Sequence, residues 1–315
     1  MKKAIIIGHS GQGGTYLSAL LTKNNYDIIG ISLGAFSSLP EYKRTIDIRN
    51  YKEVEQLIID YLPDEVYYLA AVHQSSADKP MPEGELFNKS IEINLQGLIN
   101  FLEGIKQHSK KTRVFYAASS HIFGNATEDK QNERTPLNPN CIYGITKTAG
   151  VNACHFYRNN FGVFASIGIF YNHESPLRES KYVSKKIVEA AVAIKLGKGS
   201  ELILGNLEAK IDWGYAPDYM EAIHKILNLD EAEDFIVSSG ELHTVGEFVN
   251  EVFSLLGLDP KKFVKVNSQL ITKTQKKNLF GDNQKLRTKT NWAPSVNFKE
   301  LISILVEEEL KKRRG

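Results

Sequence analysis

The chain has 315 residues, of which 42% are hydrophobic and 24% are charged, and its formal net charge at pH 7 is +2. This composition is ordinary for a soluble globular protein, and the length allows one large domain or one domain with a smaller lobe. The small net charge argues against a general nucleic-acid binder, and no apolar run is long enough to cross a membrane.

Neither the amino terminus nor the cysteines suggest export or a metal site. Residues 1–8 are basic and then apolar, but the apolar run is too short for a signal peptide and ends in a glycine turn. The two cysteines, Cys141 and Cys154, lack the spacing typical of metal ligands. We therefore expect free thiols, a cytoplasmic protein and no bound metal.

The first half of the chain alternates short apolar runs with helical patterns. The predicted strands are Ala4–Ile7, Asp27–Ile31, Glu65–Leu69, Val114–Ala117 and Phe164–Ile169. The predicted helices are Thr15–Lys23, Tyr51–Tyr61, Leu86–His108 and Tyr143–Asn160. Because short buried strands that alternate with helices pair in parallel, this half predicts a doubly wound α/β sheet of the Rossmann type.

The pattern loosens in the second half of the chain, where helices are mixed with short strands and loops. The helices predicted there are Val183–Leu196, Val245–Leu256 and Phe298–Lys312. Two pairs of residues, Asn50 with Glu53 and Thr244 with Glu247, have the spacing of capping boxes that open helices.

A glycine-rich turn follows the first predicted strand. Gly8, Gly11 and Gly14 lie between that strand and the first predicted helix, which is the setting of a dinucleotide-binding turn. Glycine lets the backbone approach a pyrophosphate, and the amino end of a helix favours its negative charge. We expect Gln12 and Gly13 in the same turn to contact the cofactor as well. A turn with a purely structural role is the alternative.

The residues expected at the adenosine end of the cofactor give a weaker signal. The end of the second predicted strand, Ile29–Gly34, has neither a carboxylate for NAD nor an arginine for the phosphate of NADP. The lack of a cation favours NAD, without excluding NADP, because a buried phosphate would stay unpaired. Asp47, which precedes Ile48, could accept from the adenine amine or could cap the helix at Tyr51. Small residues at the end of the next strand suit a flat cofactor: Leu69, Ala70 and Ala71.

Three polar residues farther along the chain form a candidate redox site. Tyr143 and Lys147 are four residues apart on a predicted helix and therefore lie on the same face. There the Lys147 ammonium can lower the pKa of the Tyr143 phenol, so that the phenol exchanges a proton near neutral pH. Ser119 could hold the same substrate oxygen. Beside a nicotinamide, these groups could oxidise an alcohol by hydride transfer.

These features suggest how the chain is divided. We expect residues 1–170 to form a dinucleotide-binding Rossmann domain, which also receives part of residues 212–240. Residues 171–315 would form mainly a smaller, interleaved α/β lobe that binds the substrate. The lobe would close over the carboxyl ends of the strands, where open α/β sheets bind ligands.

Several longer blocks resemble a known family. They are Gly11–Leu17, Pro63–Tyr67, Ala117–Gly124, Tyr143–Lys147, Asn172–Pro176, Leu204–Gly214 and Ala216–Tyr219. On these blocks the chain is similar to the extended short-chain dehydrogenase/reductases (the NAD-dependent epimerase/dehydratase family) and, within them, to the GDP-mannose 4,6-dehydratases. The resemblance runs nearly end to end, and its last three blocks are more specific than the glycine turn.

The resemblance implies a substrate, a cofactor and a reaction. The substrate would be a nucleoside-diphosphate hexose, with a GDP-hexose favoured, and the cofactor NAD or NADP. The sugar would be oxidised at C4, lose water across C5 and C6, and receive the hydride back at C6. Tyr143 would take the proton of the 4-hydroxyl, Ser119 would hold that hydroxyl, and Lys147 would tune Tyr143 and bind the nicotinamide ribose.

One position departs from the family at the elimination step. The family has a glutamate two residues after the catalytic serine or threonine, and here that position is His121. Histidine carries protons near pH 7, so His121 could replace the glutamate or could be a satisfied histidine turned from the site. Related epimerases and reductases lack the glutamate and stop at C4 redox chemistry. A 4-epimerase, 4-reductase or 4-oxidase is therefore the second hypothesis, and a non-catalytic binder of sugar nucleotides is the third.

The resemblance also implies residues that bind the nucleotide sugar. They are Asn172, His173, Glu174, Arg178, Val183 and Lys186, the last as a pyrophosphate cation. Arg178 and Lys185 could instead be solvated surface charges. Three charged nucleotide ligands of the family are replaced by Ile211, Thr272 and Gln275, so the sequence defines the base less well than the diphosphate sugar.

The family also predicts how subunits associate. Its members pair through two helices per subunit, which here would be Leu86–His108 and Tyr143–Asn160. Their facing apolar stripes would form a four-helix contact, and we expect a homodimer. Some members form tetramers through an arginine-rich loop, and the corresponding residues Ser32–Ser38 contain no arginine, which makes a tetramer the less favoured assembly.

Overall fold

The computed structural model describes residues 1–32, 46–75, 78–270 and 278–314. Its main feature is a sheet of six parallel strands in the order β10-β5-β4-β3-β1-β2. Their bounds are β1 Lys3–Ile7, β2 Asp27–Ile31, β3 Glu65–Tyr68, β4 Arg113–Ser119, β5 Ala165–Phe170 and β10 Asp234–Val237. The five strands predicted from the sequence are confirmed, and β10 is an edge strand that the sequence patterns did not reveal.

The strand order reverses beside β1. The chain extends the sheet from β1 to β2 on one side and then returns to place β3 on the other side. The connection from β1 to β2 and the connection from β3 to β4 therefore leave the carboxyl ends of two adjacent strands in opposite directions. Open α/β sheets bind ligands at this reversal point, and the glycine turn predicted to hold a dinucleotide follows β1 directly.

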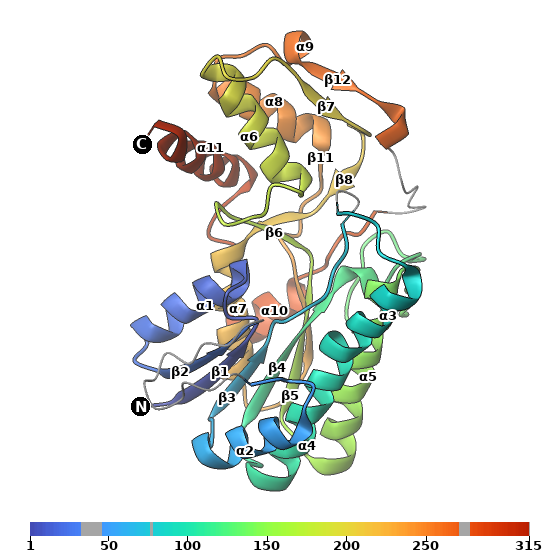
Figure 1. The fold of residues 1–315 in the computed structure, drawn as a ribbon, viewed down its shortest axis with the longest axis vertical. Helices are drawn as coiled ribbons and strands as arrows, with labels where there is room; N and C mark the ends of the chain where they lie inside the picture. Colours follow the sequence, from blue (N-terminus) through green and yellow to red (C-terminus); the bar gives the residue numbers. More distant parts are fainter. Residues whose placement is uncertain (33–45, 76–77, 271–277, 315) are drawn as a thin grey trace.

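Helices cover both faces of the sheet (Figure 1). On one face lie α2 Tyr51–Tyr61, α4 Gly97–His108 and α5 Ile142–Phe161, and on the other lie α1 Gln12–Lys23, α7 Ala216–Leu227 and α10 Gln284–Thr290. Alternate residues of β1 supply the two cores, with Ile5 and Ile7 on the first face and Ala4 and Ile6 on the second. Burial on both faces explains why β1 is apolar at successive positions. The predicted Rossmann-type α/β fold is confirmed.

The predicted helix Leu86–His108 changes its pitch in the middle. It consists of α3 Glu83–Ile91, a π-helical turn η1 Glu92–Gln96, and then α4, without a break between them. Such π-turns are rare and often occur at functional sites. Here the turn carries Asn94, whose side chain is fully buried.

The smaller lobe lies over the carboxyl ends of the strands (Figure 1). Its own core joins α6 Val183–Lys195, α8 Val245–Leu255, α9 Pro260–Phe263 and α11 Phe298–Arg314 to the pair β7 Leu202–Leu204 and β12 Val264–Val266. Two further pairs are β6 Asn172–Glu174 with β9 Trp213–Tyr215, and β8 Lys210–Ile211 with β11 His243–Thr244. Because α7, β10 and α10 belong to the layers of the main sheet, the chain passes between sheet and lobe more than once.

The two predicted capping boxes have different outcomes. At the start of α8, Thr244 Oγ accepts from the Glu247 N–H at 2.9 Å and the Glu247 carboxylate accepts from the Thr244 N–H at 2.7 Å, so this box is confirmed. Asn50 caps α2 with its side chain, but the Glu53 carboxylate accepts from the backbone N–H of Asp47 at 2.8 Å. The return bond predicted for this second box is therefore wrong, because Glu53 reaches past the cap to the preceding turn.

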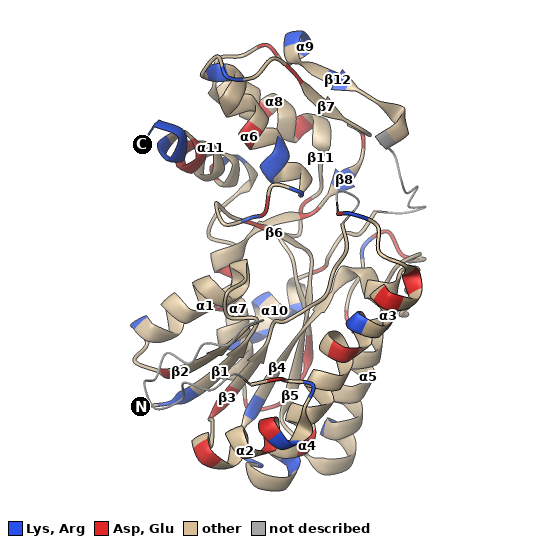
Figure 2. Ribbon diagram, viewed as in Figure 1, with Lys and Arg blue, Asp and Glu red and all other residues tan. Residues whose placement is uncertain are grey.

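Charged residues of both signs occur on the sheet layers and on the lobe (Figure 2). Among the described residues, none of the helices combines the length and apolar character that a membrane span requires. Within the same ranges, no group of three or more potential ligands could hold a metal ion.

Candidate active site

The glycine turn lies between β1 and α1 and packs against the end of β3. Gly8 has a φ of +91°, and a Cβ atom at this position would lie 2.8 Å from the backbone nitrogen of Ala70. The Gly8 N–H donates to the Ile31 carbonyl at 2.8 Å. A side chain at Gly8 would therefore be both strained and crowded. The N-cap of α1 is Gly11, which has no side chain to cover the first N–H groups of the helix, so a pyrophosphate fits there.

Gln12 connects this turn to the lobe. Its Nε2 donates to the His173 carbonyl at 2.9 Å, and its Oε1 accepts from Ser175 Oγ at 2.6 Å. The side-chain amide of Gln12, a residue predicted to contact the cofactor, is thus engaged with the segment that begins at β6. The backbone N–H at the start of α1 is the group that Gln12 can still offer to a phosphate.

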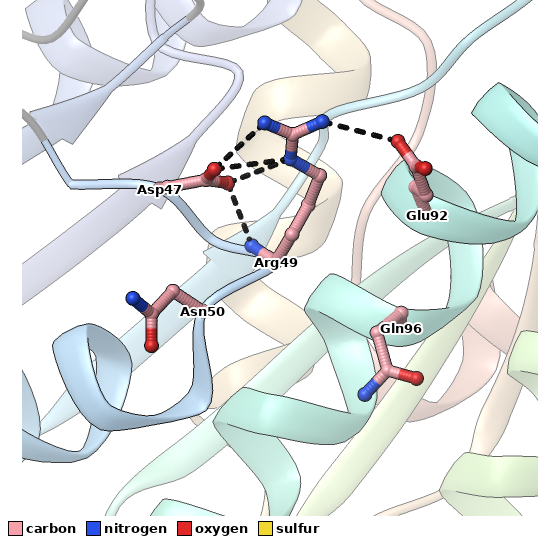
Figure 3. Close-up of a pocket in the computed structure, with 5 residues that line it drawn as sticks. All are labelled: Asp47, Arg49, Asn50, Glu92 and Gln96. Carbon is pink, nitrogen blue, oxygen red and sulfur yellow. Dashed lines mark hydrogen bonds and ion pairs between the residues drawn. The ribbon is translucent and has the colours of Figure 1, made fainter.

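The adenosine end contains an arginine that the sequence analysis overlooked. Arg49 forms a fork on the Asp47 carboxylate, with its Nη2 2.7 Å from Asp47 Oδ2, and its Nη1 lies 3.1 Å from Glu92 Oε2 (Figure 3). This hydrogen bonding lowers the pKa of Asp47. Asn50, not Asp47, is the residue whose side chain caps α2, so the capping alternative for Asp47 is wrong.

A cavity of about 410 Å³ lies at this end. Its lining residues are Asp47, Arg49, Asn50, Glu92 and Gln96 (Figure 3). Ile48, the other residue predicted to bind adenine, is buried, and its carbonyl accepts from Asn100 Nδ2 at 2.8 Å. The adenosine end therefore offers polar side chains of both signs, with the Asp47 carboxylate already bound to an internal cation.

The small residues after β3 lie beside the glycine turn. The Leu69 N–H donates to the Ile7 carbonyl at 2.8 Å, which continues the pairing of β3 with β1. Ala70 is the residue that approaches Gly8, and Ala71 is exposed. This arrangement leaves a surface of small side chains beside the turn, as a flat ring system requires.

Ser119, Tyr143 and Lys147 meet at the carboxyl end of β4. Ser119 is the last residue of β4, and Tyr143 forms a hydrogen bond with it. Tyr143 and Lys147 share one face of α5, and Lys147 Nζ lies 5.9 Å from the centre of the Tyr143 ring. Lys147 is only 1% exposed, and its Nζ donates to the Ala117 carbonyl at 2.7 Å. The structure thus brings together the three residues that the sequence singled out.

Burial controls the protonation of this pair. Removal from water lowers the pKa of the Lys147 ammonium to about 7. Burial also raises the pKa of the Tyr143 phenol above its usual range, and the Ser119 hydrogen bond and the charge of Arg178 oppose this only in part. The net direction is opposite to the lowering expected from Lys147, because desolvation of the phenol outweighs the charges around it.

His121 lies beside Tyr143. It belongs to the short 3₁₀ turn η2 Ser120–Ile122, and its backbone N–H donates to Ser119 Oγ at 3.3 Å. The centres of the His121 and Tyr143 rings are 5.8 Å apart, and His121 Nδ1 lies 3.8 Å from Cys141 Sγ. The alternative in which His121 turns from the site does not describe this geometry.

A second histidine, His73, also lies against Tyr143 and was not singled out from the sequence. Its ring centre is 4.8 Å from that of Tyr143, in an edge-to-face contact. The Tyr182 hydroxyl lies 3.5 Å from His73 Nδ1, and the Arg178 guanidinium carbon lies 3.5 Å from the centre of the Tyr182 ring. His73 follows the small residues after β3, and its position after a strand end was the signal that could have identified it.

Asn94 in the π-turn η1 is another residue that the sequence analysis missed. Its Oδ1 accepts from the Val72 N–H at 2.8 Å, and its Nδ2 donates to Thr146 Oγ1 at 3.0 Å. It therefore links the segment that carries His73 to the helix that carries Tyr143 and Lys147. No local pattern marks this asparagine, because its partners are far away in the chain.

A family model of GDP-mannose 4,6 dehydratase matches residues 5–305. The chain belongs to the GDP-mannose 4,6 dehydratase family. GDP-mannose 4,6 dehydratase 2 of Arabidopsis thaliana is 31% identical to it, over 98% of this chain and 87% of the plant protein.

Solved structures of similar fold include two proteins with a bound dinucleotide. RMD from Pseudomonas aeruginosa, complexed with NADPH, has a TM-score of 0.81 at 20% identity and covers 99% of this chain and 100% of its own. dTDP-glucose 4,6-dehydratase from Bacillus anthracis str. Ames, in complex with NAD, has a TM-score of 0.82 at 17% identity and covers 100% of this chain and 98% of its own. At these identities the likeness concerns the fold.

Family resemblance predicted six residues that bind the substrate. Some of them already contact other residues of the chain, and others are exposed. Glu174 is buried, accepts from Ser184 Oγ at 2.6 Å and lies 3.2 Å from Arg178 Nε. His173 stacks on the Tyr219 ring, and burial lowers its pKa to about 4. Because Arg178 stacks on Tyr182 and pairs with Glu174, the alternative that it is a solvated surface charge is wrong.

Two adjacent lysines near the start of α6, Lys185 and Lys186, differ in their exposure to solvent. Lys186 is exposed, and its Nζ donates to the Ile203 carbonyl at 2.9 Å. Lys185 is buried, with its Nζ 2.9 Å from Glu309 Oε2, so it is not the surface charge considered as an alternative. Val183, the first residue of α6, is half-buried, and Asn172 is exposed. Thr272 and Gln275 lie outside the described residues, as does most of the predicted tetramer loop.

Proposed function

We propose that the chain is a nucleotide-sugar 4,6-dehydratase of the GDP-mannose 4,6 dehydratase type that works with NAD or NADP. The observation that carries the proposal is the match of the family model over residues 5–305. The glycine turn at the reversal point of the sheet supports a dinucleotide, and the cluster of Ser119, Tyr143 and Lys147 beside it supports alcohol oxidation. A GDP-hexose is the substrate class that we infer.

A dinucleotide held at the glycine turn by its pyrophosphate would supply, through its nicotinamide, the redox chemistry at C4 and, in reverse, at C6. Tyr143 would take the proton of the 4-hydroxyl while Ser119 holds the same oxygen by a hydrogen bond. Since the pKa of Lys147 is about 7, this side chain changes its charge easily in the neutral range. A neutral Lys147 could accept the proton of Tyr143, and the phenolate that results could then take the proton of the 4-hydroxyl.

The 4-ketone would make the C5 hydrogen acidic and so prepare the loss of water. A proton-carrying group must then act at C5 and at the C6 oxygen. His121, with its ring centre 5.8 Å from that of Tyr143, stands where the family has its glutamate and is our first assignment for this chemistry.

The test of the proposed function uses purified protein, GDP-mannose and NAD or NADP. We expect a product lighter than the substrate by one water, detected by mass spectrometry. Replacing Tyr143 by Phe removes the proton acceptor at the 4-hydroxyl, and product formation should fall by at least about 100-fold. Tyr16→Phe in α1 is the matched control and should behave as the unmodified protein.

Because His121 replaces a carboxylate, a 4-epimerase, 4-reductase or 4-oxidase is the second candidate function. A 4-epimerase or 4-reductase would use the same Ser119, Tyr143 and Lys147 but would not release water. A product of unchanged mass would favour an epimerase, and a product differing by two hydrogens would favour a 4-oxidase or 4-reductase. If Tyr143→Phe left the biological activity of the protein intact, a non-catalytic binder of sugar nucleotides would be the better description.

We further propose a homodimer. Ile145 and Phe156 on α5 are exposed, at 41% and 54%, and are spaced so that they share one face of the helix. Ile91, at the end of the neighbouring α3, is also exposed at 38%. Apolar side chains on two adjacent long helices support the four-helix contact expected from the sequence.

A further inference from the structure

His73 lies where the sheet, α5 and the lobe meet. The residue follows β3, its ring packs edge-on against Tyr143, and its other neighbour Tyr182 lies just before α6. The ring centres of His73 and Tyr143 are 4.8 Å apart, which is closer than the 5.8 Å between His121 and Tyr143. His73 is therefore the imidazole nearest to the ring of the predicted redox residue.

The two nitrogens of His73 have different surroundings. Nδ1 lies 3.5 Å from the Tyr182 hydroxyl, whose ring is in turn held by the Arg178 guanidinium at 3.5 Å. With the Nδ1–H donating to the Tyr182 hydroxyl oxygen, Nε2 carries the lone pair of the neutral ring and is the nitrogen that can face a sugar. The segment around His73 is also tied to the lobe by Lys181, whose Nζ lies 3.4 Å from Asp78 Oδ1.

Two imidazoles thus lie close to the Tyr143 ring and to each other, and the three rings form a compact triangle. The His73 and His121 ring centres are 6.0 Å apart. A C5 hydrogen and a C6 oxygen are on adjacent carbons, and two proton carriers at this separation can contact both. Loss of water needs one group that accepts a proton and one that donates a proton.

We propose that His73 is the base that removes the C5 proton, while His121 gives a proton to the C6 oxygen. The assignment deepens the proposed function and rests on it. The C5–H bond breaks and the proton moves to His73 Nε2, the electron pair forms the C5–C6 double bond, and the C6–O bond breaks as the oxygen takes a proton from His121. After reduction at C6, C5 regains its proton from His73. The proton that Tyr143 took from the 4-hydroxyl replaces the one that His121 gave, so the net loss is one water.

The electrostatic surroundings set the charge of the His73 ring. Burial lowers the pKa of His73 to about 4, and the nearby His121, Arg178 and Lys181 add to this effect while Asp78 opposes it. The ring is therefore neutral at pH 7 and has a lone pair for a proton.

The experiment follows oxidation at C4, proton exchange at C5 and loss of water as separate signals. The enzyme is loaded with the oxidised dinucleotide and mixed with GDP-mannose in deuterated water. Absorbance of the reduced nicotinamide reports oxidation at C4, deuterium in recovered substrate and product reports exchange at C5, and mass reports loss of water. For His73→Gln we expect C4 oxidation to persist, so that reduced nicotinamide accumulates, while C5 exchange and water loss both fall by about 100-fold or more. For His121→Gln we expect C5 exchange to persist and only water loss to fall.

A substrate with fluorine in place of the 6-hydroxyl separates the two roles further. Fluoride leaves without a proton, so its release should be restored in His121→Gln and should stay slow in His73→Gln. Tyr182→Phe keeps the aromatic contacts but removes the hydroxyl beside Nδ1, and C5 exchange should fall by about fivefold, the value of one hydrogen bond. His108→Gln is the matched control. His108 is the last residue of α4 and pairs with Glu55 of α2, so this variant should behave as the unmodified protein.

Three results would overturn the assignment. Unchanged C5 exchange in His73→Gln would show that His121 handles both protons. A parallel loss of C4 oxidation and C5 exchange in His73→Gln would show a structural role only. If the unmodified protein neither reduces its nicotinamide nor releases water from GDP-mannose, the proposed function itself is wrong, and the assignment of His73 is withdrawn with it.

Discussion

Lys147 shows how a single residue couples catalysis to stability. Its side chain lies in the core with one hydrogen bond to a backbone carbonyl, and burial lowers its pKa to about 7. In the unfolded chain a lysine has a pKa of about 10.4. A lysine at this position is therefore costly for folding, and the cost depends on pH.

The sign of that dependence gives the first prediction. Between about pH 7 and pH 10 the unfolded chain holds one more proton at Lys147 than the folded chain does, so its contribution to the free energy of unfolding rises by about 1.4 kcal/mol per pH unit. The penalty is full below about pH 7 and is relieved as the pH rises. Urea unfolding of the unmodified protein and of Lys147→Met should therefore show a difference in free energy that changes by about 2 kcal/mol between about pH 7.5 and pH 9.5.

Lys198→Met, at an exposed position after α6, is the control and should give a difference that is the same at both pH values. A pH-independent difference for Lys147→Met would mean that the buried side chain keeps its proton across this range.

Arg49 shows how an internal ion pair can occupy a carboxylate that was predicted to bind a ligand. The end of the second strand contains no arginine. Arg49, which lies just before α2, nevertheless binds the carboxylate of Asp47, a residue predicted to contact the adenosine. A guanidinium fork on Asp47 is fixed by two parallel hydrogen bonds. The carboxylate considered for the adenine amine is thus part of an internal pair in this structure.

At the scale of the elements, the π-turn in the long helix determines where Asn94 points. The Asn94 carbonyl accepts from Tyr116 Oη at 3.2 Å, and the Ile93 carbonyl accepts from Tyr68 Oη at 2.5 Å. The two tyrosines, from β3 and β4, thus join the backbone of the π-turn to the sheet. The turn is therefore built into the packing of helix on sheet.

We predict that Asn94→Ala destabilises the protein by about 1–3 kcal/mol, because the half-buried Val72 N–H loses its partner and the buried Thr146 hydroxyl loses one of its hydrogen bonds. Urea unfolding measures the effect. Asn88→Ala, on an exposed position of α3, is the control and should stay within about 0.5 kcal/mol of the unmodified protein. Equal losses for the two variants would contradict the role given to Asn94.

At the scale of the whole molecule, the sheet layers and the lobe are built from interleaved segments. α7 and β10 return to the sheet after the first lobe segment, and α10 returns again before α11 completes the lobe. The contacts around Tyr143 come from both parts, since His73 and His121 follow sheet strands while Tyr182 and Arg178 lie before α6. Movement of the lobe would therefore change the surroundings of the reactive groups.

The proposed dimer is tested at the same scale. Phe156→Asp places a charge in the exposed apolar stripe of α5, and we expect sedimentation velocity at micromolar concentration to show a monomer where the unmodified protein is a dimer. Leu255→Asp, at an exposed apolar position on α8 of the lobe, is the matched control and should leave the dimer intact. A dimer that persists in Phe156→Asp, or that is lost equally in Leu255→Asp, would place the subunit contact elsewhere.

The sequence by itself determined the features that depend on neighbouring residues. Five strands, the long helices, the glycine turn and the shared face of Tyr143 and Lys147 all follow from periodicity and spacing within about 20 residues, where the backbone geometry is regular. The family resemblance, which also belongs to the sequence, located Ser119 and His121 relative to these elements.

Only the tertiary structure decided which distant groups meet and how deeply they are buried. His73 and Tyr182 are more than 100 residues apart, Lys185 pairs with a carboxylate of the last helix, and β10 is recognised as a strand only beside β5. Contacts of this kind depend on how the layers pack, which no local pattern encodes. The protonation of Tyr143 and Lys147 belongs to the same class, because the pKa of a group depends on the loss of water around it, and that loss is a property of the assembled fold.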